Sequence, residues 1–204
     1  AVLLAKYYFH ADRVYATCSE SRHMPYVHRL LSDSDNDRVI DMETQVFEQI
    51  IRQDAEAETE TQYQQQQQDT RKGYVNVVID TLGGYDLWKK SCELLDHDSY
   101  FCSIVRPREL LEEDASIMDL LKFGGTLVME KLKHWTMDHP NFYCLSTMDN
   151  SDGALEHLAD FFANKMDQVH ITEFSMLEAK RAHELFYGHD LPGKIVINIS
   201  QEQQ

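Results

Sequence analysis

The stretch at residues 75–84 (VNVVIDTLGG) decides the fold. Residues 75–80 are rich in β-branched side chains, which predicts a strand buried on both faces, as central parallel strands are. TLGG at residues 81–84 predicts a turn, and the pattern over residues 86–95 predicts a helix. Residues 100–105 (YFCSIV) then predict the next strand. A strand, a helix and a further strand in this order indicate a parallel α/β sheet.

The same alternation extends towards both ends of the chain. On the N-terminal side we expect helices over residues 1–10, 21–31 (with Pro25 in the first turn) and 44–52, and strands over residues 12–19 and 38–41. On the C-terminal side we expect helices over residues 109–121, 154–164 and 177–187, and strands over residues 141–148, 169–174 and 194–200. Gly124 and Gly125 are expected to end a helix, and residues 127–135 fit either a strand or a helix. This order predicts a doubly wound parallel sheet.

Residues 53–72 interrupt the pattern with an acidic, glutamine-rich sequence. We expect an exposed insertion without regular structure, either a solvated loop or a partner-binding segment. Because it precedes a strand, it should lie at the edge of the sheet where the strands begin. Ligands bind at the opposite edge, beside the strand C-termini.

Composition excludes several classes of protein. The net charge of −16 argues against nucleic-acid binding, because phosphates would repel the chain. No stretch approaches the roughly 20 apolar residues that span a bilayer. Ten histidines are present, but neither they nor the cysteines have metal-ligand spacing, so we expect no metal site. The dispersed Cys18, Cys92, Cys102 and Cys144 fit buried thiols in a reducing intracellular compartment, either the cytoplasm or the mitochondrion.

Four segments in order carry a family resemblance: residues 11–23 (ADRVYATCSESRH), 75–84, 100–105 and 175–199 (SMLEAKRAHELFYGHDLPGKIVINI). Together they resemble the cofactor domain of medium-chain dehydrogenases/reductases, and within that superfamily the zinc-independent quinone-reductase-like and enoyl-reductase-like branch. The closing pattern is matched by Phe174, Leu177, Glu178, Ala179, Ala182, His183, Gly193, Lys194, Ile195 and Val196.

The resemblance implies a Rossmann-type domain over residues 1–168 and a C-terminal segment, residues 169–204, that in the family completes a GroES-like catalytic domain. It also implies that the first strand, its glycine-rich loop and the rest of the catalytic domain belong before Ala1. The expected function is the C-terminal NADP(H)-binding portion of a reductase of quinones or of conjugated carbonyl or enoyl groups. The alternative is a catalytically inactive accessory or structural subunit of a larger, mitochondrial assembly. Expected partners are the missing N-terminal part, another protein of a larger complex, or a second copy of the chain.

The candidate cofactor residues fall into two groups. The first group lies at the end of the strand expected at residues 12–19, where side-chain hydroxyls and a basic residue suit the 2′-phosphate of NADP. The alternative is that these residues form a helix cap beside a solvated arginine. The group comprises Thr17, Ser19, Ser21 and Arg22. The second follows the next strands, where backbone would flank the adenine and the two riboses; ordinary strand–helix turns are the alternative. It comprises Asp80, Thr81, Gly83, Ser103, Ile104 and Val105. Lys194 matches a lysine that in some relatives reaches the cofactor, and it fits a surface position equally well.

Three positions depart from the family pattern. His10 stands where a glycine commonly ends the first helix, and Met42 stands where some relatives place a tyrosine beside the 2′-phosphate. Residues 96–99 (DHDS) replace a proline–glycine–glycine turn. These departures suggest relaxed cofactor geometry.

Overall fold

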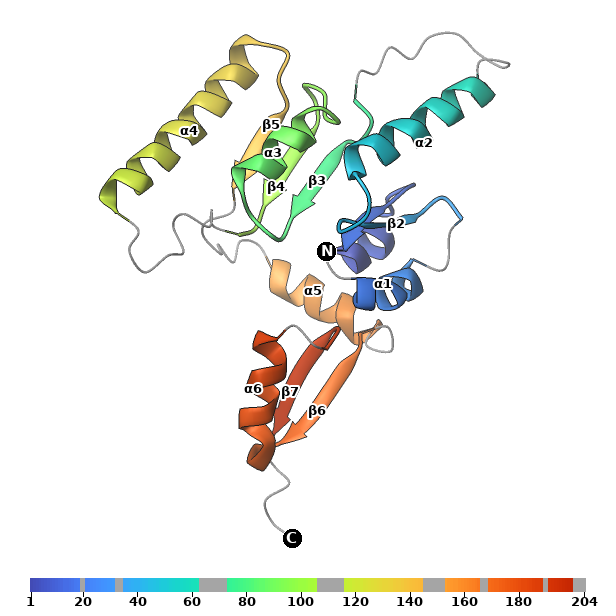
Figure 1. Ribbon diagram of the computed structural model, residues 1–204, viewed down its shortest axis with the longest axis vertical. Helices are drawn as coiled ribbons and strands as arrows, with labels where there is room; N and C mark the ends of the chain where they lie inside the picture. The colour runs from blue at the N-terminus through green and yellow to red at the C-terminus, as the bar shows by residue number, and fades with distance from the viewer. Residues whose placement is uncertain are drawn as a thin grey trace. The chain divides into compact units, whose positions relative to one another are not determined.

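The computed structural model describes residues 1–18, 21–31, 35–62, 73–105, 116–144, 153–165, 169–188 and 191–199. The chain divides into two units, each with its own parallel strands (Figure 1). Unit 1 joins Ala1–Glu43 to Asn150–Gln204, and unit 2 is the continuous segment Thr44–Asp149. No helix among the described residues is both long and apolar enough to cross a membrane.

Unit 2 contains a parallel three-stranded sheet. Its strands are β3 (Val77–Asp80), β4 (Tyr100–Ser103) and β5 (Asn141–Cys144), and they pair in the order β3-β4-β5. Asp80, the last residue of β3, lies opposite Ser103, the last residue of β4. The alternation of strands and helices expected from the sequence is therefore confirmed here, and the C-terminal ends of β3 and β4 are level with each other.

One tryptophan organises the core of unit 2. Trp88 lies on α3 (Tyr85–Cys92) and is 2% exposed. Its ring meets Phe101 of β4 and Phe142 of β5 edge-on, at centroid distances of 5.1 and 4.8 Å. Edge-to-face contacts of this kind stabilise beyond the area they bury. They fix α3 against one face of the sheet.

The opposite face of β3 is open. Val77 is 55% exposed and Ile79 is 39% exposed, whereas Val78 packs into the Trp88 cluster. The expectation that this strand is buried on both faces is wrong. Successive side chains point to opposite faces of a strand, and only the face that carries Val78 is covered by α3.

Two helices of unit 2 run further than the sequence predicted. α2 spans Phe47–Gln62, so residues 53–62 continue a helix instead of forming an irregular insertion; residues 63–72 lie outside the described residues. Its Glu, Gln and Ala residues are good helix formers even where no apolar stripe marks them. α4 spans Ile117–Thr136 and passes through Gly124 and Gly125 without a break. Each glycine costs about 1 kcal/mol in a helix, which the neighbouring Leu, Met and Lys residues and the packing of α4 against β5 offset.

In unit 1, β1 (Tyr15–Cys18) pairs in parallel with β2 (Arg38–Asp41). A π-helix, Leu4–Tyr8, precedes β1. The 3-10 turn Ser21–His23 and α1 (Met24–Leu30) follow it, with Pro25 in the first turn as expected. Lys6 holds the fully buried carboxylate of Asp37 at 2.8 Å, and the other oxygen of Asp37 accepts the Val14 N–H. This ion pair ties the first helix to the loop before β2.

His10 ends the first helix in the left-handed region, with φ of 52°. It is the non-glycine residue with positive φ among the residues that the structure describes. The sequence placed it where relatives carry glycine, and the backbone conformation gives the physical reason for that glycine.

The rest of unit 1 is α5 (Ala154–Ala163) and a βαβ element. In this element β6 (Ile171–Ser175) and β7 (Lys194–Asn198) pair in parallel, connected through the 3-10 turn Met176–Glu178 and α6 (Ala179–Tyr187). Gly193, with φ of 84°, precedes β7, and a Cβ there would lie 2.1 Å from the carbonyl oxygen of His170. Only glycine fits at this turn.

Candidate functional site

A buried hydrogen bond joins the C-terminal ends of β3 and β4. Asp80 and Ser103 are 2% and 5% exposed, and the Ser103 hydroxyl donates to Asp80 Oδ2 at 2.8 Å. Asp80 Oδ1 accepts the backbone N–H groups of Leu82 and Gly83, each at 2.9 Å. Both carboxylate oxygens therefore hold the strand end and the turn after it, as aspartate side chains do in Asx turns.

The turn presents backbone to open space. Gly83 and Gly84 have φ of 75° and 120°, a region that side-chain-bearing residues rarely adopt. A Cβ built on Gly84 would meet no atom within 4 Å. Thr81 and Leu82 are exposed beside it, so a ligand can approach this backbone closely.

The chain after β4 lies next to this turn. Ile104 donates its N–H to the Asp80 carbonyl at 3.0 Å and is 52% exposed. The structure thus brings together all six predicted residues of the second group: Asp80, Thr81, Gly83, Ser103, Ile104 and Val105. Asp80 and Ser103 point inward and shape the site, while the Thr81 and Ile104 side chains face outward. Sequence reasoning missed Leu82, although one apolar residue within a polar turn was a usable signal.

The first group lies in unit 1. Thr17 is exposed on β1, opposite Ile40. Ser21 begins the 3-10 turn, and Ser19 lies outside the described residues. Arg22 is exposed, and its Nη2 donates to the carbonyl of Gly188 at 3.1 Å. Gly188 is the C-cap of α6, where a cation complements the helix dipole.

Lys194 is exposed at the start of β7, and its backbone N–H bonds the His170 carbonyl at 2.8 Å. Asp41, which the sequence argument did not single out, ends β2 as Asp80 ends β3: it is 8% exposed and accepts the Glu43 N–H at 2.9 Å. An aspartate at the last strand position, followed by a turn, is the shared signal.

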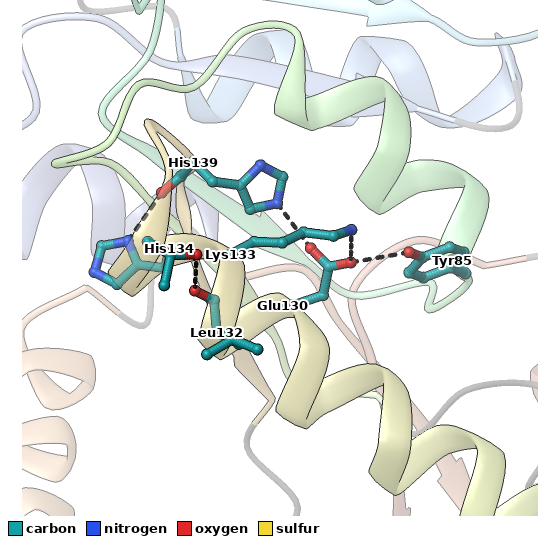
Figure 2. Close-up of polar contacts among 7 residues, drawn as sticks. Tyr85, Glu130, Leu132, Lys133, His134 and His139 are labelled. Carbon is teal, nitrogen blue, oxygen red and sulfur yellow. Dashed lines mark hydrogen bonds and ion pairs between the residues drawn. The ribbon is translucent and has the colours of Figure 1, made fainter.

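A buried carboxylate, Glu130, connects three donors in unit 2 (Figure 2). Glu130 lies on α4 and is 1% exposed. Its Oε1 accepts the Tyr85 hydroxyl at 3.0 Å and Lys133 Nζ at 2.7 Å, and its Oε2 lies 2.7 Å from His139 Nε2. A carboxylate only accepts, so Nε2 of His139 carries a proton. The cluster joins α4 to the start of α3 and to the loop before β5.

The charges in this cluster stabilise one another. Burial alone raises the pKa of Glu130, but the hydrogen bonds from Lys133, His139 and Tyr85 outweigh burial and lower the pKa. The hydrogen bond to Glu130 raises the pKa of Lys133. Burial, with the Glu130 hydrogen bond second, raises the pKa of Tyr85. Glu130 is therefore an anion near neutral pH, and Tyr85 keeps its proton.

The surroundings of Glu130 point to an anchoring role. His134 Nδ1 bonds the His139 carbonyl at 2.9 Å, and the His134 ring stacks on His97 at 4.4 Å (Figure 2 shows the first contact). Burial, followed by the charge of Glu130, raises the pKa of Cys92 to about 12, so this thiol is not a nucleophile. The sequence argument missed Glu130; a lone acid within the apolar stretch at residues 127–135 was the available signal.

No metal centre is visible in the part of the chain that the structure describes: no three His, Cys, Asp or Glu side chains there are grouped to hold an ion. The strand-end turns instead match the place where α/β sheets bind nucleotides.

A sequence profile of the family described as "Zinc-binding dehydrogenase" matches residues 36–197. The chain belongs to this family. The predicted membership of the medium-chain dehydrogenase/reductase superfamily is thereby confirmed for the cofactor domain. No curated protein matches the chain in sequence.

Solved structures of this superfamily share the fold. Benzyl alcohol dehydrogenase from Acinetobacter calcoaceticus is 15% identical with a TM-score of 0.61, over 97% of this chain and 46% of its own. The CurK enoyl reductase is 14% identical with a TM-score of 0.57, over 97% and 50%. The yhdH oxidoreductase from Salmonella enterica, solved in complex with NADP, is 13% identical with a TM-score of 0.52, over 98% and 49%. The chain spans about half the length of each, and the Rossmann-like fold class is confirmed.

Proposed function

We propose that the chain is the NADP(H)-binding portion of a reductase that acts on quinones or on conjugated carbonyl or enoyl groups without zinc. The observation that carries the proposal is the turn after β3, which exposes glycine backbone at the ligand-binding edge of a parallel sheet. The chain that contains this turn belongs to a dehydrogenase family. An NADP complex and an enoyl reductase among the similar structures support it.

The residues present fit a dinucleotide. Gly84 leaves open space beside the turn. The hydrogen bond between Asp80 and Ser103 holds the strand ends from which the turn begins. The exposed Leu82 and Ile104 offer apolar surface to a base, and the Thr81 hydroxyl offers a polar contact to a ribose. The bound cofactor would supply the hydride, and these residues would hold and orient it.

Within unit 1, taken by itself, Arg22 is the residue that we propose for binding a 2′-phosphate. Its guanidinium is exposed and presents several N–H donors in a plane, which suits bidentate binding of a phosphate. The described residues include no group of three His, Cys, Asp or Glu side chains that could hold zinc.

The alternative, an inactive accessory or structural subunit, is favoured by one contact. Arg22 donates to Gly188 at 3.1 Å, so this side chain already has a structural partner at the end of α6. In such a subunit the arginine would serve the fold, and nucleotide would not bind.

A titration separates the two functions. NADPH and NADH are added to the purified chain while nicotinamide fluorescence is followed. The reductase proposal expects NADPH to bind more tightly than NADH, and Arg22→Ala to weaken NADPH by at least about tenfold, the equivalent of roughly 1.4 kcal/mol, with NADH unchanged.

Arg181→Ala is the matched control, because Arg181 is an exposed arginine on α6 whose side chain is 70% accessible. It should leave both affinities unchanged. No binding of either nucleotide at millimolar concentration would rule out cofactor binding by this chain. Equal affinity for NADPH and NADH would contradict the assignment of Arg22.

A further inference from the structure

An apolar strip runs along α4, the yellow-green helix in Figure 1. Seven large apolar residues of the helix are between 48% and 81% exposed: Ile117, Met118, Leu121, Val128, Met129, Leu132 and Trp135. Monomeric proteins rarely expose contiguous apolar patches of more than a few hundred Å². A strip of this extent marks an interaction surface.

α4 cannot rotate about its axis to bury the strip. Glu130 is held by Tyr85 and His139, and Lys131 Nζ donates to Asn141 Oδ1 at 3.0 Å. These contacts fix the rotation of the helix about its axis. They also draw Lys131 towards β5 and Lys133 towards Glu130, away from the middle of the strip.

The spacing along the strip is that of a helix–helix seam. Its central line alternates steps of three and four residues: Met118, Leu121, Gly125, Val128, Leu132 and Trp135. This is the a/d repeat that lets two helices pack along their length. Gly125 is exposed, and a Cβ built on it would meet nothing within 4 Å, so the seam is open at that point.

The residues of this central line are complementary to those of a second, antiparallel copy of the helix. If two copies of α4 cross antiparallel about a point between Gly125 and Val128, each glycine faces the valine of the other copy. Leu121 then faces Leu132, and Met118 faces Trp135. A parallel pair would instead set glycine against glycine and tryptophan against tryptophan, leaving a gap beside a bulge. We propose that α4 pairs antiparallel with α4 of a second copy of this chain.

Size and charge favour this occupant. A helix of 20 residues is about 30 Å long, so two such faces bury on the order of 1,000 Å² in total, near the lower limit of specific interfaces. The pairing is isologous, as in most homodimers. A surface membrane helix normally carries a lysine-rich polar face, whereas two lysines of α4 serve internal contacts.

Salt should strengthen the dimer. Each chain carries a net charge of −16, so two copies repel one another, and added salt screens that repulsion while the apolar contact persists. Attachment to anionic lipid through lysines would weaken under the same change. The direction of the salt effect therefore distinguishes the two occupants.

Sedimentation equilibrium of the full chain tests the pairing. We expect a monomer–dimer equilibrium with a dissociation constant on the order of 10 µM that tightens between about 0.05 and 0.5 M NaCl. Val128→Glu places a carboxylate in the seam of both copies and should weaken the dimer at least about tenfold.

Val46→Glu makes the same exchange at an exposed valine before α2 and should leave the equilibrium unchanged. Circular dichroism checks that both variants fold.

Orientation is tested by disulfide trapping. Chains carrying Leu121→Cys are mixed with chains carrying Leu132→Cys, and each is also oxidised alone. In the antiparallel pair the two substituted positions lie opposite one another, whereas like positions are about 16 Å apart, beyond the roughly 7 Å that a disulfide spans. The mixture should cross-link and neither chain alone should.

Three results would overturn the proposal. One is a monomer at about 200 µM, well above the expected dissociation constant. Another is trapping of each substituted chain with itself and not with the other. The third is a chain that stays monomeric but sediments with phosphatidylserine vesicles, with Val128→Glu abolishing that binding, which would assign the strip to a lipid surface.

Discussion

Replacing Glu130 with Gln tests whether this carboxylate anchors α4. Glutamine keeps the length and one acceptor oxygen, which can still receive the Tyr85 hydroxyl on the Oε1 side. Its amide nitrogen then faces His139 Nε2, where donor meets donor in place of the present 2.7 Å contact. The change removes the charge and one hydrogen bond while adding almost no volume.

The magnitude follows from the contacts. A hydrogen bond to a charged group contributes about 1.5–3 kcal/mol, and the one to His139 is lost. Lys133 contributes little, because its side chain is 38% exposed and water screens the pair. We expect Glu130→Gln to lower the free energy of unfolding by about 2 kcal/mol at pH 7, which is a fall of about 1 M in the urea midpoint.

The pH dependence gives a sharper test. The pKa of Glu130 is lowered from its ordinary value of 4.5, so the folded state binds this proton less tightly than the unfolded state. The stabilisation is therefore present above pH 4.5 and is lost as pH falls through the folded pKa. Once protonated, glutamate resembles glutamine, and the two proteins should converge.

The assay is urea unfolding followed by circular dichroism at a series of pH values from neutral downward. Glu184→Gln on α6 is the control, since Glu184 is 65% exposed and lies 3.9 Å from Lys180; it should change almost nothing. A difference between wild type and Glu130→Gln that stays constant as the pH falls would refute the reasoning, as would no difference at pH 7.

Three other substitutions have expected outcomes. Gly193→Ala puts a Cβ 2.1 Å from the His170 carbonyl oxygen, so we expect a loss of more than about 3 kcal/mol in thermal unfolding; a near-neutral result would contradict the strained turn. His10→Gly relieves a left-handed residue with φ of 52° and should raise stability by up to about 1 kcal/mol, seen as a higher melting temperature and not a lower one. Ser103→Ala removes the 2.8 Å bond to Asp80 and should cost about 1–2 kcal/mol in urea unfolding, an effect that would be absent if the turn stood without it.

Local sequence patterns predicted the strands well. The strand expected at residues 38–41 is observed as Arg38–Asp41, and those expected at residues 75–80 and 100–105 contain β3 and β4. β-branched and aromatic runs that end in turn residues leave few other conformations open. Because the C-terminal ends of parallel strands meet at one edge of a sheet, the sequence also predicts that Asp80 and Ser103 lie at the same edge.

Features that depend on distant packing were not predictable. Gly124 and Gly125 argued for a break, yet α4 continues through them because its inner side is held by contacts outside the helix, such as Lys131 to Asn141. In the Glu130 cluster, the hydrogen-bonded Tyr85 and Glu130 lie 45 positions apart, and no local pattern encodes that pairing. Exposure of Val77 likewise depends on which face of β3 receives a helix.

The division of the chain into a continuous and a discontinuous unit has a consequence for biosynthesis. Unit 2 is one continuous segment, so all of its residues are available for contact with one another once Asp149 has left the ribosome, while translation continues. Unit 1 must wait, because contacts such as Arg22 to Gly188 close a loop of 166 residues. Ala1–Glu43 is therefore made before unit 2 and completes its contacts after it. During that interval β1 and β2 are, among the described residues, paired only with each other, and such strand edges are open to pairing with other chains.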